Sequence, residues 1–291
     1  MKLSVTPYSF HLHHYAGRMD VFTMIETIKY RYRLDAVDMW NPQMLSITDF
    51  DYLGKIKDAL LRAGITVCNY AIDGANIWDP DPELRKRNAD FYLENVKAAE
   101  FLGAKSVKVD TGSHYLPHYA YAWDYDPTVM SRNQNAFAAN PDEKAVEENR
   151  YYSDEMLDYF RAKLGEYCER ASDMGYDIVL ENHWGPMLVA SELVKVVKAC
   201  SHPRLGILSH LGRWCGACAE SAEETVAPYT KYIHIDRAAA DTEFARKAKP
   251  YLDAGYDGYW GVEYTEENED EFAIVEFILA TAKRHLTPKT V

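Results

Sequence analysis

The sequence predicts a single-domain α/β fold, a (β/α)8 barrel spanning residues 1–291. Short apolar or β-branched runs alternate with longer segments of helical period almost from end to end, and these runs number eight. The 291 residues, 47% of them apolar, suffice for one large core, and a barrel of about 250 residues is a common solution at this length. No G-x-G-x-x-G turn follows the first run, which disfavours an open nucleotide-binding sheet.

The eight runs predict the strands of the barrel in chain order. They are Leu3 to Thr6, Ala36 to Met39, Thr66 to Tyr70, Ser106 to Val109, Ile178 to Leu180, Leu205 to Leu208, Tyr232 to Ile235 and Tyr259 to Val262. Between them, apolar residues recur every three to four positions, as at Leu53, Ile56 and Leu60, which predicts amphipathic helices. Glycine follows several of these helical segments, in LRAGITV, FLGAKSV and DMGYDIV, where a left-handed C-cap residue is expected.

One interval between predicted strands is longer than the others. About 70 residues separate the fourth strand from the fifth, and the excess falls in Ser113 to Asn149, a segment rich in Tyr, Trp, Asn and Pro. Long loops in compact domains serve as lids or binding surfaces, but aromatic residues are also enriched at subunit contacts. We therefore expect a long insertion after strand four that is either a lid or a subunit contact.

Charge and composition narrow the class of partner. The 45 acidic and 32 basic residues give a net charge of -13, which would repel a phosphate backbone, so nucleic acid is not expected. The chain shows no run of about 18 apolar residues and no leader-like N-terminus, so we expect no membrane association and a cytoplasmic location. Five scattered cysteines fit a reducing compartment better than a disulfide framework.

Four polar residues fall at the carboxyl ends of four consecutive predicted strands. Glu181 follows DIVL, His210 follows LGILS, His234 lies in KYIHID and Glu263 follows YWGV. One such residue alone would be interpreted as a helix cap or a core histidine, but (β/α)8 barrels carry their chemistry at this end of the strands. Two carboxylates and two imidazoles that converge there predict a site for one divalent metal ion, Mn, Fe, Co or Zn, with Mn or Zn favoured.

The segments VLENHWG, GILSHLGRW, YIHIDR and GYWGVEY, with AVDMWNPQ as weaker support, resemble the sugar phosphate isomerase/epimerase family of xylose-isomerase-like TIM barrels. The resemblance spans essentially the whole chain. It implies one divalent ion held by Glu on strand five, Asp on strand six, His on strand seven and Glu on strand eight. Glu181, His234 and Glu263 match three of these positions.

The fourth position departs from the family pattern. Where that pattern reads G-x-x-x-D-x-x-H, this chain has Gly206, His210 and Arg213. Either His210 still ligates the ion and Arg213 binds an anionic group of the substrate, or the site is degenerate and the chain only binds a sugar. We favour ligation because the Asp is replaced by another type of ligand.

The resemblance implies an enzyme that isomerises or epimerises a sugar by proton transfer next to a carbonyl, through a metal-stabilised enediolate. Glu181 and Glu263 would be both ligands and proton carriers. A lyase or hydrolase that acts on an oxidised keto-glycoside, and a catalytically silent sugar-binding protein, are the alternatives. The expected partner is a small-molecule sugar, with mild preference for a non-phosphorylated one, and a homodimer or homotetramer is compatible with the sequence.

Further candidate substrate contacts surround these positions: His183, Arg213, Trp184, Lys108 and Tyr8. His183 shares strand parity with Glu181 and is either a substrate contact or a loop residue facing water. Trp184, Tyr8 and also Trp40 either stack on a sugar ring or pack at the rim.

Lys108 shares strand parity with Asp110, so it is either a buried ion pair or a substrate-binding lysine. Asp38 and Asp236 are interior carboxylates that either orient the ligands or accept ordinary hydrogen bonds. Two other motifs are set aside. Cys215 and Cys218 resemble a thioredoxin-like redox pair, but that pair follows the first strand of a small βαβ fold and these cysteines follow the sixth predicted strand. The histidines of HLHHYAG are expected to be loop residues.

Overall fold

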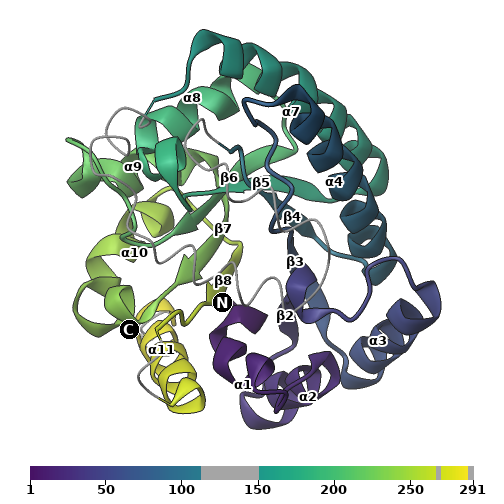
Figure 1. The fold of residues 1–291 in the computed structure, drawn as a ribbon. Coiled ribbons are helices and arrows are strands. Elements are labelled where there is room, and N and C mark those ends of the chain that lie inside the picture. The colour runs from purple at the N-terminus through teal and green to yellow at the C-terminus, as the bar shows by residue number, and fades with distance from the viewer. Residues whose placement is uncertain (113–150, 267–269, 288–291) are drawn as a thin grey trace.

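The computed structural model describes residues 1–112, 151–266 and 270–287, and the predicted insertion at Ser113 to Asn149 lies outside them. Eight parallel strands form one sheet in the order β1-β8-β7-β6-β5-β4-β3-β2, which curls into a nearly closed barrel with helices around it (Figure 1). The predicted (β/α)8 fold is confirmed. The strands are β1 (Lys2–Val5), β2 (Ala36–Trp40), β3 (Thr66–Ala71), β4 (Ser106–Val109), β5 (Asp177–Glu181), β6 (Leu205–His210), β7 (Thr230–Ile235) and β8 (Tyr259–Val262).

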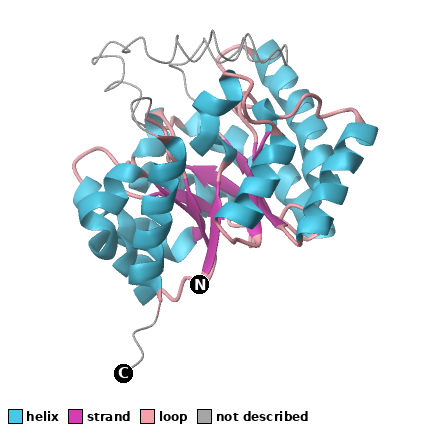
Figure 2. Cartoon of the chain, turned by 90° about the horizontal axis from the view of Figure 1, so that it is seen from below, coloured by secondary structure: helices cyan, strands magenta, loops and turns pink. Residues whose placement is uncertain are grey.

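The helices follow the strands along the chain and enclose the sheet in the side view (Figure 2). They are α1 (His11–Tyr15), α2 (Val21–Glu26), α3 (Phe50–Ala63), α4 (Pro82–Leu102), α7 (Asp154–Met174), α8 (Ala190–Cys200), α9 (Ala222–Val226), α10 (Phe244–Asp253) and α11 (Glu271–Leu286). As predicted, α3, α4 and α7 each end at a glycine with positive φ. Among the described residues, no helix is both long and apolar enough to cross a membrane.

Two apolar layers hold the barrel together. The larger lies between the sheet and the helices and includes outward-facing strand residues such as Val107, Ile178 and Ile207. The smaller lies inside the barrel, where Ala36, Cys68, Val179, Leu208 and Tyr232 pack against one another. Both layers are buried, and the inner one fills the barrel between its two ends.

The seam of the barrel lies between β1 and β2, the two strands that end the sheet order. Ser4 on β1 donates a hydrogen bond from Oγ to Oδ1 of Asp38 on β2, at 3.0 Å, and both side chains are buried. A side-chain contact therefore joins the two edges where the backbone ladder is interrupted.

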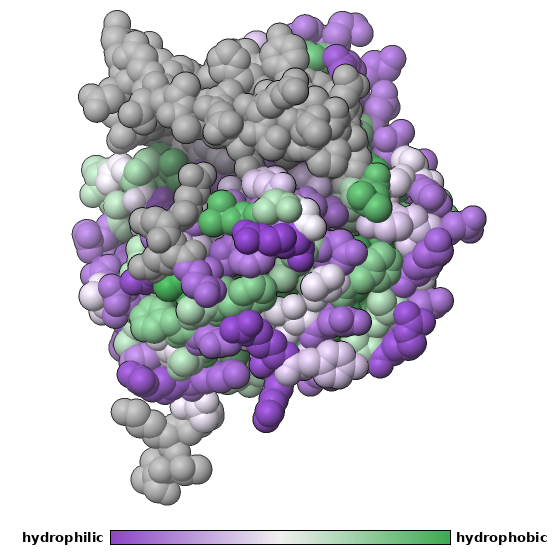
Figure 3. All heavy atoms as spheres, turned by 60° about the horizontal axis from the view of Figure 1, so that its bottom comes forward, coloured by the Kyte–Doolittle hydropathy of each residue, from purple (hydrophilic) through white to green (hydrophobic). Residues whose placement is uncertain are grey.

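One face of the described residues can be followed in a space-filling view (Figure 3). On the face shown in Figure 3, hydrophilic residues cover most of that surface, and hydrophobic residues lie between them. Such a mixture is ordinary for a chain with many charged residues.

We expect Gly112→Ala to destabilise the fold more than Gly64→Ala. Gly64 ends α3 at φ +63°, and a Cβ there would meet no atom within 4 Å, so its substitution should cost about 1 kcal/mol from backbone strain alone. Gly112 follows β4 at φ +78°, and a Cβ there would overlap the carbonyl oxygen of Trp78. Strain and overlap together should lower the free energy of unfolding by about 3 kcal/mol.

Urea unfolding of both variants and the parent, followed by circular dichroism, measures these costs. Equal losses in the two variants would contradict the role assigned to the Trp78 contact.

Candidate metal centre

The four strand-end residues predicted from the sequence converge at one end of the barrel. Glu181 and His210 are the last residues of β5 and β6, His234 lies in β7, and Glu263 follows β8. In the sheet register His210 is the partner of His234, which turns both rings toward the interior. Glu181, His210 and His234 are buried, and the side chain of Glu263 is 14% exposed. We call these four residues the four-residue cluster.

The donor atoms of the four-residue cluster are spaced like the ligands of one metal ion. His210 Nδ1 lies 3.0 Å from Glu263 Oε2 and 3.5 Å from Glu181 Oε1. His234 Nδ1 lies 3.4 Å and 3.3 Å from the same two oxygens. Four ligands arranged tetrahedrally at about 2.1 Å from an ion are about 3.4 Å apart. The residues therefore fit a divalent ion, and they form a possible metal site.

Each imidazole of the four-residue cluster has a carboxylate behind it, which is hydrogen-bonded in the case of His234 and in ionic contact in the case of His210. His234 Nε2 donates to Asp38 Oδ2 at 3.1 Å, and His210 Nε2 lies 3.4 Å from Asp236 Oδ2. Both rings thus direct Nδ1 into the cluster, the arrangement in which metal-binding histidines are usually oriented. The interior positions expected for Asp38 and Asp236 agree with the structure.

Asp38 is itself fixed by residues that the sequence did not single out. Its carboxylate accepts hydrogen bonds from Ser4 Oγ, from Asn69 Nδ2 and from the hydroxyl of Tyr232. Ser4 and Tyr232 occupy inward positions of their strands. In the sequence, only the alternation of inward and outward residues along each strand could have identified them.

Asn182, the amide that follows Glu181 in VLENHWG, joins the ends of two strands. Its Oδ1 accepts from the backbone N–H of His210 at 2.6 Å, and its Nδ2 donates to the carbonyl of His210 at 2.9 Å. This buried amide pins the end of β6 to the end of β5 and fixes the backbone that carries His210.

The surrounding carboxylates keep both imidazoles protonated in the absence of a metal ion. Burial alone would lower the pKa of His210, but its contacts with carboxylates, Asp236 foremost, raise that pKa to about 9. In His234 burial again acts to lower the pKa, but Glu263 and Asp38 raise it well above its ordinary value. A divalent ion could replace these protons, because it supplies the same positive charge.

The two glutamates of the four-residue cluster are held as anions. Burial would raise the pKa of Glu181, but His183, Lys108 and the two imidazoles hold it well below its ordinary value. The pKa of Glu263 is also lowered against the effect of burial, mainly by His234. Both carboxylates are thus available as ligands and as proton acceptors.

A second group of charged side chains adjoins the four-residue cluster. Lys108 Nζ donates to Asp73 Oδ1 and Asp110 Oδ2, both at 2.9 Å, and to His183 Nδ1 at 3.2 Å. It also lies 3.5 Å from Glu181 Oε2. The structure confirms the Lys108–Asp110 pair. Asp73 was missed in the sequence, although it follows β3 at the same end of the barrel as the residues that were found.

The aromatic candidates lie beside this second group. The ring of His183 stacks on Trp184, and Tyr8 stacks on His11 and meets the edge of Trp40. Trp40 Nε1 donates to Asp73 Oδ2 at 2.7 Å, which links the aromatic residues to the ammonium of Lys108.

Arg213 lies next to the four-residue cluster without entering it. Its Nε donates to Asp236 Oδ2 at 3.3 Å, and its Nη2 donates to Thr265 Oγ1 at 3.1 Å. Since Asp236 also contacts His210, the two residues that depart from the family pattern share one carboxylate.

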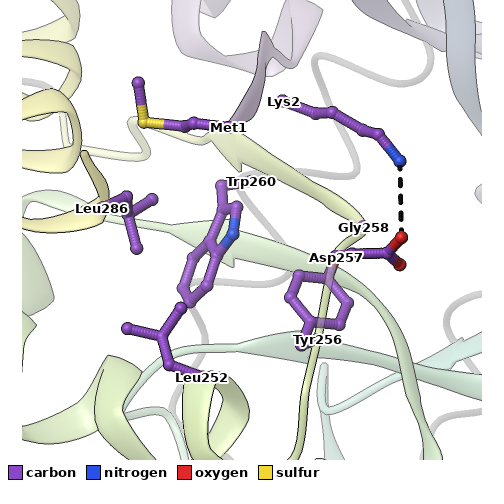
Figure 4. A pocket seen from close by; sticks show the side chains of 8 residues that line it. All are labelled: Met1, Lys2, Leu252, Tyr256, Asp257, Gly258, Trp260 and Leu286. Atoms are coloured by element: carbon purple, nitrogen blue, oxygen red, sulfur yellow. Dashed lines mark ion pairs between the residues drawn. The ribbon is translucent and has the colours of Figure 1, made fainter. Parts of the chain in front are cut away.

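The motifs that were set aside contribute no residue to the four-residue cluster. The histidines of HLHHYAG were expected to be loop residues, but His11, His13 and His14 lie in α1, and His13 pairs with Glu271 of α11. Among the described residues the cysteines, including Cys215 and Cys218, form no disulfide. A hollow of about 300 Å³ lies at the opposite end of the barrel, beside the starts of β1 and β8 (Figure 4). Its lining includes Trp260, Leu286 and a 4.0 Å ion pair between Lys2 and Asp257. It therefore does not share residues with the four-residue cluster.

Comparison with known proteins identifies the family. A model of the xylose isomerase-like TIM barrel family matches residues 30–281, and the chain belongs to this family. No curated protein sequence matches the chain.

Solved structures of the same fold cover nearly the whole chain. L-ribulose 3-epimerase superposes with a TM-score of 0.68 at 13% identity, covering 100% of both chains. The 3-keto-D-glucoside 4-epimerase of E. coli gives 0.66 at 12%, covering 97% of this chain and 99% of that one. A xylose isomerase-like TIM barrel protein from Mycobacterium smegmatis, in complex with magnesium, gives 0.63 at 12%, covering 96% and 97%. At these identities the similarity shows the fold.

We expect the affinity for Mn²⁺ to rise with pH. His210, with a pKa of about 9 in the metal-free chain, must lose its proton before Nδ1 can bind an ion. Affinity should therefore increase roughly tenfold per pH unit for each proton released, up to about pH 9. Calorimetric titration in two buffers with different heats of ionisation counts the protons.

The metal-free chain should show the opposite trend. The raised pKa of His210 stabilises the fold fully below pH 6.5, and this contribution is lost as the pH rises through about 9. An affinity for Mn²⁺ that is constant from pH 6 to 9 would argue against the protonated cluster.

Asp38→Asn should weaken Mn²⁺ binding by about 10- to 100-fold, because a neutral amide holds His234 less firmly than a carboxylate does. Asp35→Asn, which changes a largely exposed carboxylate just before β2, is the matched control and should bind as the parent does. Equilibrium dialysis measures both, with circular dichroism to confirm the fold. Unchanged affinity in folded Asp38→Asn would refute the orienting role.

Proposed function

We propose that this xylose isomerase-like TIM barrel is a divalent-metal-dependent sugar epimerase or isomerase that acts by proton transfer next to a carbonyl. The observation that carries the proposal is the four-residue cluster itself. Two buried imidazoles turn Nδ1 toward two carboxylate oxygens at 3.0 to 3.5 Å. The epimerases that share the fold, acting on L-ribulose and on 3-keto-D-glucoside by their names, support a sugar as the substrate class.

Glu181, His210, His234 and Glu263 would hold the ion. When bound, it supplies electrophilic polarisation of a carbonyl and a neighbouring hydroxyl of the sugar. The magnesium complex of a structural neighbour supports a divalent ion, and the mixed nitrogen and oxygen donors of this chain favour Mn²⁺ or Zn²⁺.

The proton is moved by the chain's own carboxylates. Glu181 and Glu263 reach the cluster from β5 and from the end of β8, so a sugar between them would present its reacting carbon to two anionic side chains. One carboxylate accepts the proton next to the carbonyl, and the other takes a proton from solvent water and delivers it to the opposite face. Because both pKa values are lowered, both groups start as bases at neutral pH.

The groups around the cluster would orient the sugar. We propose that His183, Trp184 and Tyr8 form its binding wall, since His183 is partly exposed beside the buried Lys108. Arg213 would meet a polar group of the substrate with the part of its guanidinium that Asp236 and Thr265 leave free. Lys108 would act mainly through its three partners, because Asp73, Asp110 and His183 use its three N–H donors.

Incubation of the Mn²⁺-loaded protein with a keto-sugar in deuterated water tests the proposal. The sugar should gain deuterium at the carbon next to the carbonyl, and mass spectrometry and NMR should detect the labelled substrate and its epimer or isomer. Glu181→Gln and Glu263→Gln should each lower the exchange by at least about 100-fold, because a neutral amide cannot carry the proton.

Glu276→Gln is the control, because Glu276 is an exposed residue of α11 whose partner is Arg31. Release of an unsaturated fragment would instead identify a lyase. Binding of sugar without exchange in any metal-loaded sample would identify a silent sugar-binding protein.

A further inference from the structure

The ammonium group of Lys108 occupies a position with the surroundings of a bound metal ion. Asp73, Asp110 and His183 offer donor atoms that all lie within 4.8 Å of one another, a spacing that could hold a cation. Nζ of Lys108 lies 2.9 Å, 2.9 Å and 3.2 Å from these atoms. We call the three partners the lysine cage.

The ammonium inside the lysine cage is buried, whereas Asp73 and His183 at the edge of the cage are 24% and 19% exposed. The side chain of Lys108 is 1% exposed, and that of Asp110 is 2% exposed. The three N–H donors of the ammonium are matched by three acceptors, so the cation is saturated by the protein itself. Burial would lower the pKa of Lys108, but Asp110, Asp73 and Glu181 outweigh it and raise the pKa well above its ordinary value.

Glu181 joins the lysine cage to the four-residue cluster. Its Oε2 lies 3.5 Å from Lys108 Nζ, and its Oε1 lies 3.3 Å from His234 Nδ1. The two oxygens of one carboxylate thus face two cation positions. A carboxylate shared in this way is the arrangement found between adjacent ions in two-metal sites.

One carboxylate oxygen of the lysine cage lacks a hydrogen-bond donor. Oδ1 of Asp110 is buried and has no hydrogen-bond partner among the described residues. A buried carboxylate with an unpartnered oxygen is costly, and removal of the neighbouring cation would increase that cost. The cage therefore requires a positive charge, and the chain provides it covalently.

We propose that the ammonium of Lys108 takes the place of a second metal ion, so that the chain binds one divalent ion rather than two. Lys108 is then a positioning residue that neutralises Glu181 Oε2 and leaves Oε1 for the four-residue cluster. The role given to Glu181 rests on the proposed function, but the cation position in the cage stands on the contacts of Lys108 alone. A purely structural ion pair would differ, because its cage would have no affinity for a metal ion.

Lys108→Met tests this inference. Methionine keeps the apolar stem and removes the charge, which leaves Asp73, Asp110, His183 and Glu181 Oε2 free to bind an ion. With Mn²⁺ as the probe, equilibrium dialysis should find one ion per chain for the parent and two for Lys108→Met. Electron paramagnetic resonance should show an exchange-broadened signal only in the variant, since Glu181 would bridge the two ions.

The matched controls are Lys108→Arg, which keeps a cation, and Lys105→Met, which removes an exposed lysine three positions earlier in the chain. Both should bind one ion. Two ions in the parent, or one ion in folded Lys108→Met when the parent also binds one, would overturn the inference while leaving the proposed function intact. No ion in the parent and one in Lys108→Met would support the inference and count against the proposed metal centre.

Stability provides a second measurement. The metal-free Lys108→Met chain should melt at a lower temperature than the parent. Addition of Mn²⁺ should raise the melting temperature of Lys108→Met by more than it raises that of the parent. Lys108→Gln, whose amide can still donate to Asp110, covers the case in which Lys108→Met does not fold. If neither variant folds even with Mn²⁺, a divalent ion cannot take the position of the ammonium, and the inference fails.

Discussion

Burial of negative charge at one end of the barrel is the constraint on which the site depends. Six carboxylates, those of Asp38, Asp73, Asp110, Glu181, Asp236 and Glu263, lie within contact distance of His210, His234 or Lys108. Carboxylates withdrawn from water must be paired with cations or with hydrogen-bond donors. Two imidazoles, one ammonium and one guanidinium meet this need in the protein, and the donor atoms of the four-residue cluster are spaced so that they could also hold a metal ion.

Strand register converts this constraint into geometry. Because neighbouring parallel strands lie about 4.8 Å apart, residues at matching inward positions of β5 to β8 necessarily come close together. His210 pairs directly with His234, and irregularities in the ladder occur just before Leu208 on β6 and just before Asp38 on β2. Such irregularities change which side chains of a strand point into the barrel. The register of the sheet therefore positions both the four-residue cluster and Asp38, which lies behind His234.

The departure from the family pattern is internally consistent. An imidazole at position 210 needs a carboxylate behind it if Nδ1 is to face the cluster, and Asp236 occupies that position. Arg213 donates a hydrogen bond to the same oxygen of Asp236, Oδ2, which helps to neutralise the carboxylate. The two changed residues are thus coupled through Asp236. Since structural neighbours with the same fold are only 12% to 16% identical, the chemistry of this site must be judged from its own side chains.

The sequence by itself determined the eight strands, the barrel and the four residues at the strand ends. These features are local, since they follow from apolar runs, helical period and the position of a polar residue after a run. The tertiary structure decided the partners. Ser4 and Tyr232 are 228 residues apart but both contact Asp38, Asp73 joins Lys108 from a loop after β3, and Arg213 binds Asp236. Barrel closure brings these residues together, and no short-range pattern in the chain encodes which distant side chains will meet when the strands curl into one sheet.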